Sequence, residues 1–330
     1  MELLKKLTHI TAVSGNEESI FSHIISELGD YADEIYTDSL NNIIVHKKGD
    51  GKKLMFSAHT DEIGIMANYI DDKGFIRFAT IGGVDVYTSL YQRVVFQNGT
   101  IGTVCFENKT DIKKDLKIQN MYIDIGALSK TEALNLVKPG DTASFVGEFC
   151  EGEETVVSKA LDNRAGVYIL CEALKRIKNS PFDLYFVFSS QEEIGLRGAR
   201  TAAYNIEPDI AIAVDITATG DTPECETLDI SLGLGAAIKI MDKSVICNKN
   251  VRESLEKCAK ENNIAYQFEI LTYGGTDAGA MQTVKSGAMT GAISLPLRYV
   301  HTPCETANKK DIEACIKLVS EFCIKDFILS

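Results

Sequence analysis

Several apolar stretches of this 330-residue chain are followed by side chains that can bind metal ions or move protons. All of these side chains are histidines or carboxylates: His59 and Asp61 after residues 53–58, Glu192 and Glu193 after 184–188, Asp215 after 210–214, His301 after 288–295, and Asp162 in the loop before a helix. In open α/β sheets, ligands bind outside the carboxyl ends of the strands. We therefore expect the chain to bring these side chains to one rim of a sheet.

The residue types at this rim indicate metal chemistry. Histidines and carboxylates without cysteines suit hard or borderline divalent ions such as zinc, cobalt or manganese. Two histidines and three or more carboxylates are too many for one catalytic zinc, which takes three protein ligands, but they suit two metals that share a carboxylate. Three carboxylates against two divalent cations leave a charge of about +1, which would lower the pKa of a bridging water towards neutrality.

The spacing within two short motifs suggests separate roles for neighbouring residues. His59 and Asp61 are two residues apart at a strand end, which puts both side chains on the same side of the strand. Asp61 can then accept the second imidazole N–H of His59 and fix its tautomer. Glu192 and Glu193 are adjacent, so their side chains diverge: one can bind metal while the other stays free as a general base.

Each of these residues also has an ordinary structural interpretation when it is considered alone. Asp162 is placed to cap a helix expected over 163–178. His59 alone would be a structural histidine, and Glu192 and Glu193 alone a solvated acidic pair. The coincidence of several such residues at strand ends of one sheet favours the functional interpretation.

Hydrophobic periodicity predicts the elements that must position these residues. Helices are expected over the first ~30 residues with a break at 14–16, and at 129–137, 163–178, 251–261 and 309–328; strands are expected at 42–46, 53–58, 184–188, 210–214 and 288–295, with shorter runs at 75–78, 93–96, 101–106, 121–125 and 142–145. The strand–helix alternation after residue 158 predicts an α/β sheet covered on both faces. The closely spaced short strands predict a small β-barrel or sandwich inserted at 66–157, which divides the α/β domain into 1–65 and 158–330.

Charge and cysteine usage restrict the class of protein further. The 47 acidic residues outnumber the 34 basic ones, giving a net charge of -13, which disfavours nucleic-acid binding. No apolar run approaches the ~18 residues of a membrane span, and the N-terminus turns polar too soon for a signal peptide. The nine cysteines are odd in number and form no CxxC pair, so we expect reduced thiols in a cytoplasmic protein.

Five motifs of the chain together resemble the M42 family of metallo-aminopeptidases, which includes glutamyl, leucyl and TET-like aminopeptidases and proteins labelled endoglucanase M. They are SAHTDEIG at 57–64, KALDNRAG at 159–166, QEEIGLRGA at 191–199, GGTDA at 274–278 and LRYVHTP at 297–303. The resemblance covers essentially the whole chain, including the insertion at Ile81-Gly-Gly and Asp124-Ile-Gly-Ala127.

The resemblance implies a fold, a ligand set and an activity. The fold would be a doubly wound, three-layer α/β/α catalytic domain with an inserted β-barrel-like domain. One metal would be held by His59, Asp162 and Asp215, and the other by Asp162, Glu193 and His301. Glu192 would be the general base of an aminopeptidase, and Asp61 would orient His59.

The family resemblance also implies an assembly. The inserted domain would mediate dimerisation, and dimers would assemble into a hollow tetrahedral dodecamer that admits peptide substrates. The preferred N-terminal residue does not follow from the sequence. Arg298, Gly275, Thr276 and Asp277 lie beside the motifs and are candidates for lining its pocket, although Arg298 suits a structural ion pair equally well.

Three other functions are compatible with parts of this pattern. An endoglucanase-type glycosidase would use two carboxylates and no metal, but it would leave the histidines unexplained, and the chain has no tryptophan for sugar stacking. A metal-binding scaffold would need no free carboxylate such as Glu192. A related dimetal deacylase or carboxypeptidase would use a similar metal core.

Overall fold

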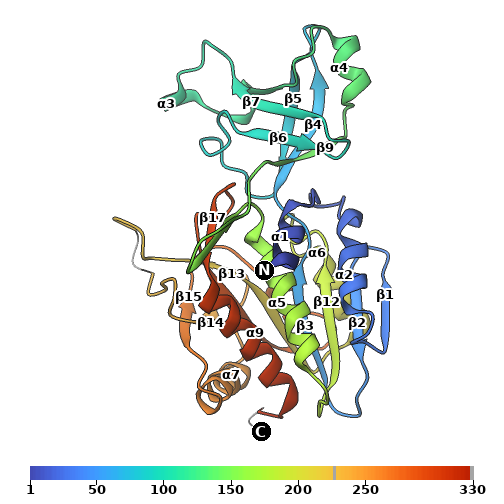
Figure 1. Ribbon diagram of the computed structural model, residues 1–330, viewed down its shortest axis with the longest axis vertical. Coiled ribbons are helices and arrows are strands. Elements are labelled where there is room, and N and C mark those ends of the chain that lie inside the picture. Colours follow the sequence, from blue (N-terminus) through green and yellow to red (C-terminus); the bar gives the residue numbers. More distant parts are fainter. Residues whose placement is uncertain (226–227, 328–330) are drawn as a thin grey trace.

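The computed structural model describes residues 1–225 and 228–327, and it has a larger part and a smaller part joined by a narrow connection (Figure 1). Within the described residues, eleven strands of the larger part form one sheet with the order β1-β2-β12-β3-β13-β16-β17-β11-β10, and β14 and β15 extend from β16. The strands are β1 Glu34–Thr37, β2 Ile43–Lys47, β3 Lys53–His59, β10 Cys150–Glu151, β11 Thr155–Ser158, β12 Asp183–Ser189, β13 Ile210–Ala218, β14 Ala236–Met241, β15 Tyr266–Ile270, β16 Met289–Arg298 and β17 Glu305–Asn308. The central strands β12, β3, β13 and β16 run parallel, so their carboxyl ends meet at one rim.

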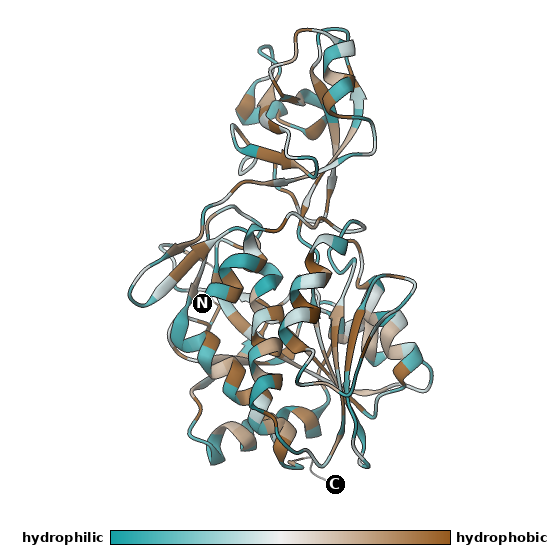
Figure 2. Cartoon of the chain, turned by 45° about the vertical axis from the view of Figure 1, so that its right-hand side comes forward, coloured by the Kyte–Doolittle hydropathy of each residue, from teal (hydrophilic) through white to brown (hydrophobic). Residues whose placement is uncertain are grey.

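Helices cover both faces of this sheet because its central strands are apolar on both sides. Leu54 and Phe56 of β3 pack on one face, and Met55 between them packs on the other. The first face is covered by α1 Glu2–His9, α2 Phe21–Leu28, α5 Leu161–Arg176, α7 Lys249–Glu261 and α9 Lys309–Ile324, and the second by α6 Arg197–Ile206 and α8 Asp277–Gln282. The helices carry both hydrophobic and hydrophilic residues, as amphipathic elements of a three-layer fold do (Figure 2).

The smaller part is a closed β-barrel with its own core. Its strand order is β4-β5-β8-β7-β6-β9. The elements are β4 Gly64–Ile70, β5 Ile76–Ile81, β6 Arg93–Phe96, β7 Ile101–Phe106, α3 Ile112–Asp115, β8 Met121–Asp124, α4 Lys130–Leu136 and β9 Thr142–Phe145. Its buried residues include Ile65, Phe78, Val104 and Ile123.

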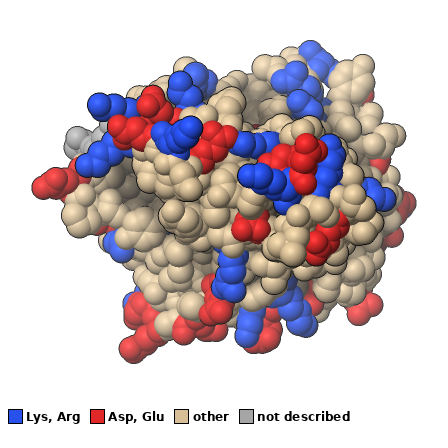
Figure 3. All heavy atoms as spheres, turned by 90° about the horizontal axis from the view of Figure 1, so that it is seen from above, with Lys and Arg blue, Asp and Glu red and all other residues tan. Residues whose placement is uncertain are grey.

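Basic and acidic side chains intermix on the face seen from above, on the barrel side (Figure 3).

The predicted fold class is confirmed: a doubly wound α/β domain carries an inserted β-barrel. The insertion was expected at 66–157, and the barrel strands span 64–145. The strands β10 and β11, at 150–158, belong to the large sheet instead, which they join through β17. The strand β4 was not expected. No helix of the described residues is long and apolar enough to cross a membrane.

Two local predictions about site residues were wrong. Asp215 does not end its strand, because β13 continues to Ala218, where Thr217 and Ala218 still pair with β16. Asp162 does not cap α5: Asn163 does, because its Oδ1 accepts a hydrogen bond from the backbone N–H of Gly166 at 3.0 Å. The backbone of Asp162 and Asn163 is not helical, and the carboxylate of Asp162 is not used to cap the helix. The terminal helix ends at Ile324, and residue 328 of the predicted range lies outside the described residues.

Candidate metal centre

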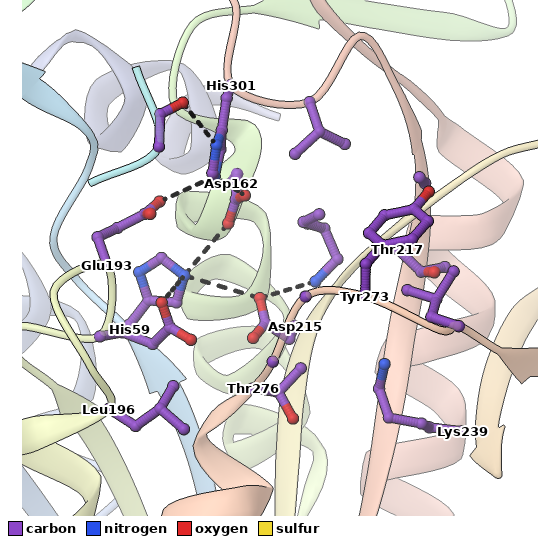
Figure 4. A pocket seen from close by; sticks show the side chains of 18 of the residues that line it. His59, Asp162, Glu193, Leu196, Asp215, Thr217, Lys239, Tyr273, Thr276 and His301 are labelled. Carbon is purple, nitrogen blue, oxygen red and sulfur yellow. Dashed lines mark hydrogen bonds and ion pairs between the residues drawn. The ribbon is translucent and has the colours of Figure 1, made fainter. Parts of the chain in front are cut away.

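The predicted site residues come together above the carboxyl ends of the central strands. His59 is the last residue of β3, Glu192 and Glu193 follow β12, Asp215 lies in β13, and His301 follows β16. Asp162 reaches the same place from the start of α5, and the side chains converge on one space (Figure 4). Parallel strands with apolar interiors thus place polar residues from five distant segments side by side.

Asp162 lies at the centre of this cluster, between the two histidines. Its Oδ1 is 3.2 Å from Nε2 of His59, and its Oδ2 is 3.3 Å from Nε2 of His301. The two oxygens of one carboxylate therefore face two different imidazoles. A carboxylate that serves two adjacent cations has this arrangement.

The remaining carboxylates lie on opposite sides of Asp162. Oδ1 of Asp215 is 3.7 Å from Nε2 of His59, whereas Oε1 of Glu193 is 3.3 Å from Nε2 of His301. Oε2 of Glu192 lies 3.9 Å from Nε2 of His59, on the Asp215 side. The side chains of Glu192 and Glu193 therefore diverge, each towards a different histidine.

Two overlapping groups of potential ligand atoms occur in this cluster. The first group consists of His59, Asp162 and Glu193, and the second of His59, Glu192 and Asp215. Within each group, the potential ligand atoms all lie within 4.8 Å of one another. The second group includes Glu192, which the resemblance assigns to proton transfer rather than to a metal. Distances alone thus allow Glu192 either role.

Burial and mutual repulsion make the carboxylates hard to ionise together without a cation. Burial raises the pKa of Glu192 well above its usual range, and the charges of Asp215 and Glu193 add to this effect. Burial also raises the pKa of Asp215, with Asp162 contributing. Burial opposes protonation of His301, but its hydrogen bonds to Asp162 and Glu193 raise its pKa to about 12.

The donor set fits a pair of divalent cations. Among the residues that the structure describes, no lysine or arginine forms an ion pair with Asp162, Glu192, Glu193 or Asp215. The nearby cation Lys159 is paired with Glu62 instead. Nitrogen and oxygen ligands without thiolates are the set that zinc, cobalt and manganese accept.

Asp61 contacts His59, and it also makes hydrogen bonds that the sequence did not predict. Nδ1 of His59 lies 3.1 Å from the backbone carbonyl oxygen of Asp61 and 3.4 Å from its Oδ1, so both groups face the imidazole that Asp61 was predicted to orient. The same carboxylate also accepts hydrogen bonds from the backbone N–H groups of Glu192 and Glu193 and from Oγ of Ser14. Asp61 thereby connects a histidine to the turn that carries both glutamates.

Glu17 holds Gln191, the residue just before the two glutamates, and the sequence did not predict this contact. Glu17 is fully buried. Its Oε1 accepts hydrogen bonds from the backbone N–H groups of Gly15 and Gln191, at 2.8 and 3.1 Å. Gln191 has a positive φ of 53°, so this acceptor stabilises a backbone conformation that non-glycine residues rarely adopt.

The barrel contributes to the site through Gly83. Nδ1 of His301 lies 3.1 Å from the carbonyl oxygen of Gly83, which fixes the orientation of the ring. A Cβ atom at position 83 would lie 2.6 Å from the same nitrogen, so a larger residue there would displace the ring. The insertion therefore forms part of the wall of the site.

A cavity of about 530 Å³ opens beside the cluster. Gly275 and Thr276 line it as expected, together with Leu271, Tyr273 and Lys239. Asp277 and Arg298 are not among its lining residues. Asp277 is buried and accepts hydrogen bonds from the hydroxyls of Ser57 and Ser189, both at 2.6 Å.

Arg298 forms the structural ion pair that the sequence left open. Its Nε and Nη2 donate to the two oxygens of Asp221 at 2.8 and 2.7 Å. This bidentate pair lowers the pKa of Asp221. It ties the end of β16 to the segment that follows β13.

Comparisons with known proteins identify the family to which the chain is similar. A family model described as M42 glutamyl aminopeptidase matches residues 41–318. A putative aminopeptidase of Acetivibrio thermocellus is 53% identical over 320 residues, which covers 97% of each chain.

Two solved structures are similar over nearly the full length. The TET aminopeptidase from Thaumarchaeota archaeon SCGC AB-539-E09 has a TM-score of 0.95 and 31% identity, covering 99% of this chain and 97% of its own. The TET1 peptidase of Pyrococcus horikoshii, which can assemble into a tetrahedron or a large octahedral shell, has a TM-score of 0.89 and 35% identity over 98% and 99% of the two chains.

Proposed function

The chain belongs to the M42 family of aminopeptidases, and we propose that it removes N-terminal residues from peptides with two divalent metal ions and Glu192 as general base. The observation that carries this proposal is the position of Asp162, whose two oxygens face His59 and His301 separately. A peptide hydrolase of this family depends on divalent metals, and the cluster provides ligands for two.

The ligand sets are those that the family resemblance implies, and the short distances around Asp162 are compatible with them. His59, Asp162 and Asp215 would hold one ion, and Asp162, Glu193 and His301 the other. Zinc or cobalt fits these donors, and manganese is also accepted. When bound, the ions lower the pKa of water and polarise the scissile carbonyl.

Glu192 is placed to move the proton that hydrolysis requires. Its side chain lines the cavity and diverges from Glu193, so a carboxylate remains beside the space where a peptide bond would lie. Glu192 would take a proton from the attacking water and give it to the leaving amine. The same carboxylate-rich wall would attract the free α-ammonium group of the substrate.

The first substrate residue would occupy the part of the cavity beyond Asp215. Gly275, Thr276, Leu271 and Tyr273 line this cavity. We assign these residues, rather than Asp277 and Arg298, to the subsite for the N-terminal side chain.

A homo-oligomer is consistent with the TET neighbours, and we propose that the barrel forms the dimer contact from which a tetrahedral dodecamer is built. Tyr69, Tyr87, Tyr91, Ile101 and Leu128 are exposed on the barrel. Aromatic residues of this kind are enriched in protein interfaces.

All nine cysteines are free thiols in the structure, which supports the cytoplasm as the compartment.

The endoglucanase alternative is not favoured. A glycosidase needs two carboxylates and no metal, so it would leave His59, His301 and their contacts to Asp162 without a function. Inhibition by a chelator separates the two activities.

The experiment that tests the proposal compares Glu192→Gln with Glu193→Gln on peptides with free and acetylated N-termini. Glu192→Gln should keep both metals and lose about 10²–10⁴-fold in kcat, because a general base contributes that much. Glu193→Gln should instead lose metal. Unchanged turnover of Glu192→Gln would remove it from the role of base, and cleavage of acetylated peptides or release from the carboxyl end would indicate a deacylase or carboxypeptidase.

A further inference from the structure

Glu305 is a buried carboxylate to which the mechanism gives no function. It is the first residue of β17, and 2% of its surface is exposed. The pairing of β17 with β11 places it opposite Ser158, just before the segment that carries Asp162. Glu305 therefore lies between two chain segments that each contribute a proposed metal ligand.

Each oxygen of Glu305 accepts a hydrogen bond from the backbone of one of these ligands. The backbone N–H of His301 donates to Oε1 at 2.8 Å, and the backbone N–H of Asp162 donates to Oε2 at 3.0 Å. Hydrogen bonds to a carboxylate are short and strong. One side chain thereby fixes the separation of two residues that are far apart in sequence.

The backbone at His301 needs such support. His301 has a φ of 62° and Tyr299 a φ of 61°, both in the left-handed region that costs free energy for residues other than glycine. His301 lies in an irregular segment between β16 and β17, where no sheet ladder holds it. The bond to Glu305 fixes the position of its backbone, and the carbonyl of Gly83 fixes its ring.

The identity of this residue matters as well as its position. Glutamine has one carbonyl oxygen and one NH₂ group, so it would place a donor against one of the two N–H groups. Burying the carboxylate of Glu305 near that of Asp162 also costs free energy. Filling space is therefore a poor explanation for a glutamate at this position. The two acceptor oxygens are what the site requires.

We infer that Glu305 is a positioning residue for the metal centre, which sets the distance between Asp162 and His301 and so determines the affinity of the ion held by Asp162, Glu193 and His301. This inference rests on the proposed function, because it takes the ligand set from there. Supporting residues of metal ligands typically contribute 10–100-fold in affinity.

The chain offers a matched control in Asp311. Its two oxygens accept hydrogen bonds from the backbone N–H groups of Gly235 and Gly233, both at 2.7 Å, and it is fully buried. Asp311→Asn removes one acceptor of the same kind, but at a position that contacts none of the proposed ligands. It reports the effect of such a change on the fold alone.

The experiment titrates metal-free wild type, Glu305→Gln and Asp311→Asn with zinc or cobalt and measures both dissociation constants by calorimetry. In Glu305→Gln, at least one of the two constants should rise about 10–100-fold. Asp311→Asn should keep both wild-type constants. Unchanged constants in Glu305→Gln, or equal changes in the two variants, would overturn the inference.

A measurement on the wild type keeps the inference testable if Glu305→Gln does not fold. Hydrogen exchange of the metal-free protein should show protected amides at His301 and Asp162, because Glu305 accepts both N–H groups without any metal. Rapid exchange at both amides would contradict the inference. Wild type that binds no metal would overturn the proposed function together with it, whereas two tightly bound metals in both wild type and Glu305→Gln would overturn the inference alone.

Discussion

The carboxylate of Asp61 accepts a hydrogen bond from the backbone N–H of Glu192 at 3.0 Å. The residue proposed to orient His59 therefore also holds the proposed general base. Since the backbone N–H of Glu193 donates to the same carboxylate, a disturbance at Asp61 reaches both glutamates at once.

Ser14→Ala tests this connection with a small change. Oγ of Ser14 donates to Oδ2 of Asp61 at 2.6 Å, and hydrogen bonds to charged groups contribute about 1.5–3 kcal/mol. We expect kcat to fall about 10-fold, which corresponds to about 1.4 kcal/mol, with the metal content unchanged. Ser19→Ala is the control, because its hydroxyl donates to the carbonyl of Thr11 in the same segment, away from Asp61. Equal activity of the two variants would contradict a role for Ser14.

Gly83→Ala tests whether the barrel shapes the metal centre. The added Cβ would lie 2.6 Å from Nδ1 of His301, so the ring must move away. We expect the affinity for one of the two metals to fall at least about 10-fold, as for other residues that orient ligands. Gly152→Ala meets only ordinary contacts at 3.5 Å and should bind metal as wild type does. Full metal affinity in Gly83→Ala would show that the insertion does not constrain His301.

Glu17→Gln tests a pH dependence of stability. Burial raises the pKa of Glu17 from 4.5 to about 7, so the folded state binds a proton that the unfolded state has released. This group therefore favours folding at acidic pH, and its contribution is lost as the pH rises towards 7. Relative to wild type, Glu17→Gln should gain about 2 kcal/mol in unfolding free energy between about pH 5 and pH 8.

The measurement for Glu17 is urea unfolding of the metal-free proteins at both pH values. Glu18→Gln is the control, because Glu18 is the exposed neighbour. It reports the effect of the same substitution at an exposed site. A pH-independent difference between Glu17→Gln and wild type would show that Glu17 is ionised throughout.

Arg298→Ala separates the structural role of Arg298 from substrate binding. The bidentate pair with Asp221 is partly exposed, so its loss should lower the unfolding free energy by about 1 kcal/mol. The KM for peptides should stay within about 2-fold, because a 10-fold change requires about 1.4 kcal/mol of lost binding. A double-mutant cycle with Asp221→Asn should give most of this energy as coupling. A KM raised about 10-fold would return Arg298 to the substrate pocket.

The sequence predicted the architecture because the pattern of apolar residues depends on local spacing. Strands such as Arg93–Phe96 and Ile101–Phe106 are short apolar runs bounded by turns, and the structure confirms both ranges. The start of α5 was predicted less well. Asp162 and Asn163 both suit a helix cap, and only the tertiary contact of Asn163 with the carbonyl of Val214 decides between them.

For the candidate site, the sequence predicted the potential metal ligands but not the residues that hold them in place. Residues that can bind a metal stand out by type at strand ends, as His59 does. Glu17 and Glu305 accept hydrogen bonds from backbone N–H groups far away in the sequence, and the carbonyl of Gly83 meets the ring of His301. The sequence neighbours of these three residues give no sign of such contacts. Such contacts depend on how the N-terminal segment, the barrel and β17 pack around the rim.

The most direct test of the account is anomalous X-ray diffraction from crystals of the metal-loaded protein. Two metal peaks are expected in each subunit, both in contact with Asp162. One should also contact His59 and Asp215, and the other Glu193 and His301. A single peak, or two peaks of which neither contacts Asp162, would contradict it.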